Sequence, residues 1–188
     1  MTTGVRARAV PGQPDMWMFV LFETLIFTAY FSVYLFFRAQ DPQPFLAAQQ
    51  QLSLGVGIFN TIVLLSSSWS VARCVETSRA GDYSRALRDA FLTIGFGVVF
   101  LVSKAFEWAH QIHLGNTISS GDFFTYYFFL TGIHLLHVLI GFVVLGVAVY
   151  QIRGTRRRSQ QLIETCATYW HTVDFLWVLI FAMLYVVR

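Results

Sequence analysis

The sequence contains few charged residues and few cysteines. Asp, Glu, Lys and Arg together make up 12% of its 188 residues, whereas soluble globular domains have roughly 25%. So little charge argues against a water-soluble enzyme. The two cysteines, Cys74 and Cys166, are too few for a disulfide framework and form no Cys-x-x-Cys pair. This excludes a disulfide-stapled scaffold and thioredoxin-like redox chemistry.

Apolar residues are abundant instead. Hydrophobic residues make up 56% of the chain and aromatic residues 17%. Each of five runs has the roughly 20 apolar residues that cross a hydrocarbon core of about 30 Å as a helix, and no alternating strand pattern competes. The sequence therefore predicts an all-α integral membrane bundle of five transmembrane helices in a single domain, residues 1–188. The predicted helices are residues 16–37, 52–72, 90–109, 123–150 and 162–187. Asp41, Pro42 and Pro44 predict a proline-containing loop that ends the first of them.

The arginines predict how the bundle lies in the membrane. If all five runs cross, Arg6, Arg8 and the basic loops after the second and fourth runs fall on one side. The other side has Arg38 and Arg188. This is the positive-inside distribution, so we expect a cytoplasmic N-terminus and a C-terminus outside. Residues 1–14 contain no apolar run, so we expect no cleavable signal peptide. Because the loop arginines account for the pI of about 9.1, we expect no nucleic-acid partner.

Several ionisable residues lie inside the apolar runs, where such groups are costly and normally face partners in the protein interior. At a helical rise of about 1.5 Å per residue, Glu23, His137 and Asp174 lie roughly 10 Å below the predicted cytoplasmic surface, on three different helices. His134 and His171 lie within about one turn of the same layer. We therefore predict an intramembrane polar core made of Glu23, His134, His137, His171 and Asp174.

A second polar site is predicted nearer the outer surface. Lys104 and Glu107 are three residues apart on one predicted helix, so they can pair within it. His110 lies just beyond them. We expect an internally satisfied pair, with contact to a lipid headgroup as the alternative. The second polar or lipid site thus consists of Lys104, Glu107 and His110.

Three interpretations of the polar core are open from the residues alone. It can be a hydrogen-bonded cluster that fixes helix packing, or a proton relay of carboxylates and histidines. His134 and His137 can also be two ligands of a metal or haem. Such a site needs three or four ligands with further support, which Glu23, His171 or Asp174 can supply. The packing cluster is our prediction, so we assign no catalytic residue and no metal ligand.

Four stretches and one glutamate resemble the subunit III family of haem–copper oxidases. Residues 169–177 are similar to the family's final-helix motif, and residues 131–141 to its penultimate-helix motif. Residues 60–67 resemble its Asn-Thr-Leu-Ser stretch, and residues 106–108 its glutamate–aromatic element. Glu23 falls where the family has an intramembrane glutamate. The matches follow the family's order from the first apolar run to the last.

The chain resembles the five-helix form of that family, because it has only the last five of the seven helices in the longest members. The resemblance implies a supporting subunit without a redox centre. In the family, catalysis belongs to subunit I of a respiratory oxidase that reduces oxygen and pumps protons. Haem and copper are therefore expected in the partner subunits I and II and not in this chain. Lys104 departs from the family, which usually has a glutamine there.

Subunit III of this family binds phospholipid between its helices, supports proton uptake into subunit I and protects subunit I from inactivation during turnover. By resemblance we expect the same roles here, with oxidase subunits I and II and membrane phospholipids as partners. The expected location is a bacterial cytoplasmic membrane. The electron donor, cytochrome c or quinol, is determined by other subunits, and the resemblance leaves it open.

Two alternatives are kept. Residues 11–17 also resemble the opening of subunit-III-like accessory proteins of nitric oxide reductase, which share the fold but serve another catalytic partner. The second alternative is a small haem- or metal-binding membrane enzyme that uses His134, His137 and His171. A total of five histidines is few for a membrane di-iron oxygenase, which counts against this alternative.

Overall fold

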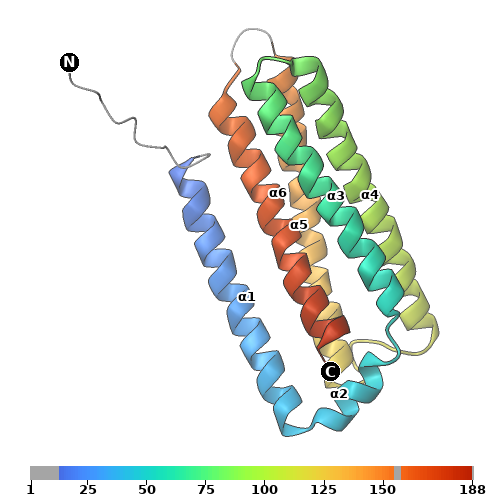
Figure 1. Cartoon of the computed structure of the whole chain (residues 1–188). Helices are drawn as coiled ribbons and strands as arrows, with labels where there is room; N and C mark the ends of the chain where they lie inside the picture. The colour runs from blue at the N-terminus through green and yellow to red at the C-terminus, as the bar shows by residue number, and fades with distance from the viewer. Residues whose placement is uncertain (1–12, 155–157, 188) are drawn as a thin grey trace.

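The computed structural model describes residues 13–154 and 158–187, and in these ranges the chain is helical and contains no β-strand (Figure 1). In chain order the elements are α1 (Pro14–Gln40), α2 (Pro42–Gln49), α3 (Leu54–Arg79), α4 (Tyr83–His113), α5 (Asp122–Arg153), α6 (Gln160–Phe181) and the π-helical segment η1 (Ala182–Val186). Five segments are long and apolar enough to cross a membrane: α1, α3, α4, α5, and α6 together with η1. The predicted all-α fold with five membrane-spanning helices is therefore confirmed.

Polar caps make the helices longer than the apolar runs. The Asp82 side chain accepts a hydrogen bond from the Arg85 backbone N–H, so that α4 begins at Tyr83, well before the apolar run. Ser159 accepts one from the Leu162 N–H in the first turn of α6. Such caps satisfy N–H groups that have no partner within the helix and contribute about 1 kcal/mol. The apolar content therefore marks the membrane-crossing part, and the caps determine where the helix begins.

The segment after α1 is a helix, where the sequence predicted a proline-containing loop. Asp41 ends α1 with an extended φ of −140°, and Pro42 then opens the eight-residue helix α2. Proline is favoured in the first turn of a helix, because its missing N–H would have no helical partner there. The loop prediction was wrong because a proline that ends one helix can begin the next. In Figure 1, α2 connects the foot of α1 to α3 across one end of the bundle.

Four helices pack together and α1 stands to one side. α3 packs against α4 and α6, and α5 packs against α4 and α6. Figure 1 shows α1 beside α6, its main neighbour among the long helices. Most apolar side chains of α1 are exposed, among them Phe22 and Leu25 at 61% each. In a membrane protein such a surface faces lipid or another subunit.

Two tryptophans of α6 occupy the centre of the bundle. Trp170 Nε1 donates to Ser67 Oγ at 2.9 Å, and Trp177 Nε1 donates to Thr61 Oγ1 at 3.1 Å, both on α3. Trp170 can also lie against α5 because residue 141 is a glycine, where an added Cβ would be 2.7 Å from the ring. Small residues allow this close approach between membrane helices. The two indoles therefore determine how α3, α5 and α6 fit together.

Six of the seven arginines among the described residues gather at one end of the bundle, which we call the basic end. It contains the α3–α4 turn and the adjoining ends of α5 and α6, with Arg73, Arg79, Arg85, Arg88, Arg153 and Arg158. The opposite end contains α2 and the α4–α5 turn, and its Arg38 is buried and donates to Tyr34 and Gln49. The orientation prediction also uses Arg6, Arg8, Arg156, Arg157 and Arg188, which lie outside the described residues. A cytoplasmic basic end stays a prediction.

Gly141→Ala is expected to destabilise the bundle, because the new Cβ collides with the ring of Trp170, which is held by Ser67. Overpacking a core typically costs about 1–3 kcal/mol, so the melting temperature of the purified chain in detergent should fall by several degrees. Gly146→Ala on the same helix is the control, because no atom lies within 4 Å of its added Cβ. Equal melting temperatures for the two variants would contradict the packing described here.

Candidate functional site

Glu23 and His137 join α1 to α5 within the membrane-spanning part. Glu23 is buried, and its Oε2 lies 3.3 Å from His137 Nε2. His137 Nδ1 lies 2.9 Å from the carbonyl oxygen of Ile133. A carbonyl can only accept, so Nδ1 must bear the hydrogen. The structure thus brings together two of the five residues predicted for the polar core.

The two side chains are an acid and a base close enough to exchange a proton. With the hydrogen on Nδ1, a neutral His137 presents a lone pair at Nε2 to the Glu23 carboxylate. At 3.3 Å, a proton on either side chain could bridge the two, because an imidazolium N–H or a carboxylic O–H can donate to the other group. With one such proton the pair would be neutral overall, which suits a membrane interior where an unpaired charge is costly.

Aromatic side chains surround the Glu23–His137 pair. Tyr169 of α6 donates its hydroxyl to the His137 carbonyl oxygen at 3.1 Å, and Phe19 of α1 stacks on Tyr169 with ring centroids 5.6 Å apart. Phe27 lies edge-on to the imidazole of His137 at 5.9 Å. The pair and these rings together form the attachment of α1 to the rest of the bundle.

His171 and Asp174 have a different neighbour, Ser68 of α3. His171 Nδ1 and Ser68 Oγ are 2.6 Å apart and share a hydrogen bond. Asp174 is 3% exposed, and Ser68 is the polar side chain beside it. Neither carboxylate oxygen of Asp174 has a hydrogen-bond partner among the described residues. These two predicted core residues therefore lie against α3 and not in the Glu23–His137 pair.

His134 lies in a third environment. It is fully buried on α5 between Phe100 and Trp177, with ring centroids 5.6 Å and 5.4 Å away. Within residues 13–154 and 158–187, no three His, Cys, Asp or Glu side chains come close enough to hold a metal ion. The alternative of a metal-ion enzyme with three protein ligands therefore finds no ligand set in that part of the chain.

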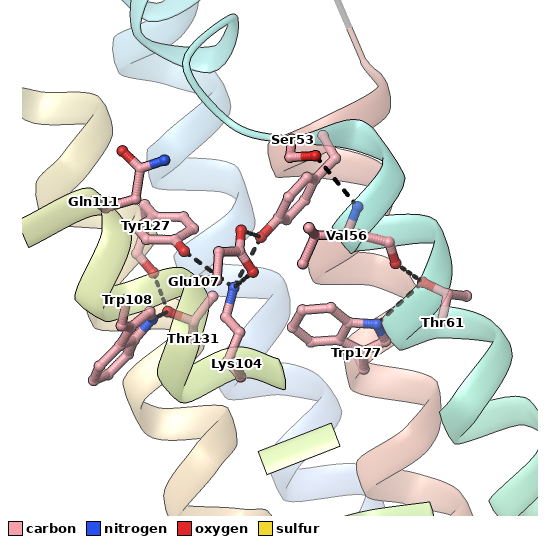
Figure 2. A network of polar contacts seen from close by, with 12 residues as sticks. Ser53, Val56, Thr61, Lys104, Glu107, Trp108, Gln111, Tyr127, Thr131 and Trp177 are labelled. Atoms are coloured by element: carbon pink, nitrogen blue, oxygen red, sulfur yellow. Dashed lines mark hydrogen bonds and ion pairs between the residues drawn. The ribbon is translucent and has the colours of Figure 1, made fainter. Parts of the chain in front are cut away.

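Lys104 lies at the centre of the second predicted site and is fully buried (Figure 2). Its Nζ donates to Glu107 Oε2 at 3.0 Å, to Tyr127 Oη at 3.2 Å and to Tyr185 Oη at 2.8 Å. Tyr185 in turn donates to Glu107 Oε1. The three hydrogens of the ammonium group thus each have an acceptor. The expected pairing of Lys104 with Glu107 is present within α4.

Aromatic faces add to the compensation of this buried charge. Lys104 Nζ lies 4.6 Å from the ring centroid of Tyr127 and 5.2 Å from that of Trp177. A cation near an aromatic face gains roughly 0.5–2 kcal/mol, more when it is desolvated. Neither tyrosine was predicted to belong to this site. Tyr127 lies on α5 and Tyr185 on η1, far from Lys104 in the sequence, so the only sequence signal for them is a polar hydroxyl within an apolar run.

His110 does not join the Lys104 cluster. Its side chain is exposed and lines a cavity of about 340 Å³ between α3 and α4. Glu107 lines the same cavity, so this residue lies between the buried cluster and the cavity. Of the three residues predicted for the second site, two are therefore paired in the interior and the third is at the surface.

A larger cavity of about 500 Å³, which we call the α1–α6 cleft, lies between α1, α3 and α6. Apolar side chains such as Val20 and Phe175 line most of it, together with His171. Arg79 and Glu164, an ion pair with atoms 2.8 Å apart, line it toward the basic end. Apolar walls with charged groups near one end suit an amphipathic molecule.

Fold and site together define a multi-pass membrane helix bundle with two buried acid–base pairs, Glu23–His137 and Lys104–Glu107. Known proteins similar to this chain identify its family. The family described as Cytochrome c oxidase subunit III matches residues 12–187. A probable cytochrome c oxidase subunit 3 from Nocardia farcinica is 31% identical over 169 residues, which cover 88% of this chain and 83% of the relative. The cytochrome c oxidase subunit 3 of a Synechocystis strain is 30% identical over 182 residues, which cover 93% and 77%.

A third relative has a composite name. It is the heme-copper oxidase subunit I+III of Aeropyrum pernix, 28% identical over 180 residues, which cover 92% of this chain and 22% of that protein. The chain belongs to the cytochrome c oxidase subunit III family. It is thus a subunit III of a haem–copper oxidase, a membrane component of the respiratory chain, and the resemblance found from its motifs is confirmed.

Lys104→Met is expected to destabilise the chain strongly, because it leaves the buried Glu107 carboxylate without its cation. Breaking a buried ion pair from one side costs about 3–5 kcal/mol, whereas replacing both partners by apolar residues is often nearly neutral. Unfolding of the chain in detergent should therefore show a large loss for Lys104→Met and a partial recovery for Lys104→Met with Glu107→Met.

The matched control is Arg85→Met, which removes an ion pair with Asp82 at the protein surface. Exposed pairs contribute about 0–1 kcal/mol, so this variant should unfold almost like the parent chain. If Lys104→Met proves as stable as Arg85→Met, the Lys104 cluster does not hold the helices together.

Proposed function

We propose that this chain is a non-catalytic subunit III that stabilises subunit I of its oxidase and supports proton uptake into it. The redox chemistry would take place at haem and copper in subunits I and II. The observation that supports this proposal best is the Glu23–His137 pair, with 3.3 Å between Oε2 and Nε2. It brings an acid and a base that can exchange a proton together at the attachment point of α1.

A carboxylate and an imidazole that share one proton can release it on one side and take up another on the other. Chains of such groups are the usual proton relays of membrane proteins. The pair also has a mechanical role, because α1 meets the bundle along a small area and most of its side chains are exposed. Loss of the pair would therefore remove a group that can exchange a proton, and it would also weaken the attachment of α1 to the bundle.

Subunit I is the proposed neighbour of this chain. The Aeropyrum pernix relative is named as subunits I and III in one protein, which supports a side-by-side arrangement of the two. The apolar outer surface of α1, with Met18, Leu21 and Phe22 more than half exposed, would contact lipid and a helix of the partner. Subunit II is proposed as a further member of the complex, on the family resemblance alone.

The α1–α6 cleft is proposed to bind a membrane phospholipid. Its apolar walls would contact the acyl chains, and Arg79 at the basic end would lie near the phosphate. We further propose that the basic end is cytoplasmic and that the membrane is a bacterial cytoplasmic membrane. The gathering of the described arginines at this end supports the orientation.

Glu23→Ala and Glu23→Gln separate the packing role from the proton role. Alanine removes both, whereas a glutamine amide can still donate to Nε2 of His137 but cannot exchange a proton. We expect Glu23→Ala to reduce co-purification of the complex or shorten its active life during turnover, with an unchanged haem spectrum. Glu23→Gln should assemble normally and lose activity faster than the parent during prolonged turnover.

The matched control is Thr28→Ala, at an exposed position of the same helix. Assembly, visible spectrum and oxygen consumption over long assays would be measured for all three variants. Normal assembly and sustained turnover in Glu23→Ala would contradict the proposed role. Glu23→Gln with parental turnover would restrict the pair to packing and overturn its part in proton uptake.

A further inference from the structure

An indole and a phenol lie next to each other in the interior of the bundle. Trp177 of α6 is 0% exposed, Tyr185 of η1 is 3% exposed, and their ring centroids are 6.4 Å apart. Indole and phenol rings can each lose a single electron without the help of a bound cofactor. An electron can therefore pass from one of these rings to the other over a short distance inside the protein.

The hydroxyl of Tyr185 has a base as its hydrogen-bond acceptor. It donates to Oε1 of Glu107, whose other oxygen, Oε2, accepts from Lys104 Nζ at 3.0 Å. A phenol that loses an electron becomes a much stronger acid and releases its proton. The Glu107 carboxylate can take this proton directly, because the hydrogen bond already joins the two oxygens. Oxidation of Tyr185 therefore needs no water in this part of the membrane interior.

Trp177 has no such base. Its Nε1 donates to Thr61 Oγ1 at 3.1 Å (Figure 2), and a hydroxyl group is too weak a base to take the proton of an oxidised indole. An oxidised Trp177 would therefore keep its N–H and remain a radical cation, which is a strong oxidant. The two rings thus differ in what they can do. Trp177 can pass an oxidation on, and Tyr185 can keep it, because its proton has a place to go.

Trp108 of α4 extends this set of rings toward the surface. Its indole is half-buried and lies 5.4 Å from the ring of Phe128, which lies 5.0 Å from that of Tyr127. Tyr127 and Tyr185 both accept a hydrogen bond from Lys104 Nζ, at 3.2 Å and 2.8 Å. Closely spaced rings therefore connect the surface of α4 to the phenol that has a base. Lys104 can go on donating to the oxygen of Tyr185 after this ring is oxidised.

We propose that Tyr185 is a one-electron redox site, which collects oxidising equivalents from the tryptophans of this chain. The primary oxidant is a one-electron oxidant such as a peroxyl radical of a membrane lipid, which takes an electron from a tryptophan and becomes the hydroperoxide anion. The oxidised Trp177 then takes one electron from Tyr185, and the phenolic proton moves to Glu107. The products are an intact Trp177, a phenoxyl radical at Tyr185 and a protonated Glu107.

The test uses an ultraviolet flash that ejects electrons from the tryptophans of the full purified chain in detergent, with a scavenger for the ejected electrons. Tryptophan and tyrosine radicals absorb at different wavelengths, so the transfer appears as the decay of the first signal and the rise of the second. We expect a tyrosine radical to form in the parent chain. Tyr185→Phe keeps the ring beside Trp177 and should lose most of the tyrosine signal, with a longer-lived tryptophan radical.

Two further variants test the assignment. Tyr150→Phe is the matched control, because this tyrosine is 75% exposed and should leave the signal unchanged. The double variant Lys104→Met with Glu107→Met keeps both rings but removes the proton acceptor together with its cation. It should lose the tyrosine signal as Tyr185→Phe does. Helical content from circular dichroism would show that each variant is folded.

A parental tyrosine signal in Tyr185→Phe would overturn the proposal, as would a loss of the signal in Tyr150→Phe, which would assign the radical to the surface. A parental signal in the folded double variant would overturn the role of Glu107 as proton acceptor. None of these results depends on oxidase partners, so they are distinguishable from a failure of the Glu23 variants in the assembled complex.

Discussion

A lysine ammonium inside a membrane must be compensated entirely by protein, and much of the helix packing follows from how Lys104 achieves this. Its three hydrogens reach Glu107 of α4, Tyr127 of α5 and Tyr185 of η1. A change in the position of any of these elements would leave a buried charge or phenol without its partner, which costs several kcal/mol in a medium without water. The cluster therefore constrains the relative positions of three segments, and Trp177 connects it to α3 through Thr61.

The attachment of α1 follows a different principle. α1 buries few side chains, and its single buried carboxylate, Glu23, pairs with His137 across the gap to α5. An acid and a base 3.3 Å apart thus connect α1 to α5, whereas the Lys104 link is an ion pair that is complete within the protein. The Lys104 cluster thus holds α4, α5 and η1 together. The Glu23–His137 pair attaches the peripheral helix α1 through two groups that can exchange a proton.

The sequence predicted those features that depend on local spacing. Lys104 and Glu107 are neighbours on one helix, so their pairing needed no knowledge of the fold. The apolar runs predicted five spanning helices for the same reason. Tyr127 and Tyr185 could not be assigned to the site, because helix rotation and the π-helical segment that places Tyr185 are set by tertiary packing. The helix α2 was missed because Pro42 is compatible with a loop and with a helix start.

The polar core shows the same limit. Depth along the helix axis follows from residue number and brought Glu23 and His137 to one level, and the structure pairs them. The direction in which a side chain points does not follow from depth. His171 and Asp174 turn toward Ser68 of α3, and His134 turns toward Phe100 and Trp177. For this reason five residues at similar predicted depth occupy three environments.

The central claim is that this chain works as a supporting subunit and that its buried polar groups serve packing and proton exchange. The most direct measurement is gentle purification of the tagged chain from its native membrane, followed by identification of the accompanying proteins and a visible spectrum. We predict haem–copper oxidase subunits I and II, haem absorption that belongs to them, and oxygen consumption. A chain isolated alone with its own haem or iron, or one accompanied by nitric oxide reductase subunits, would contradict the account.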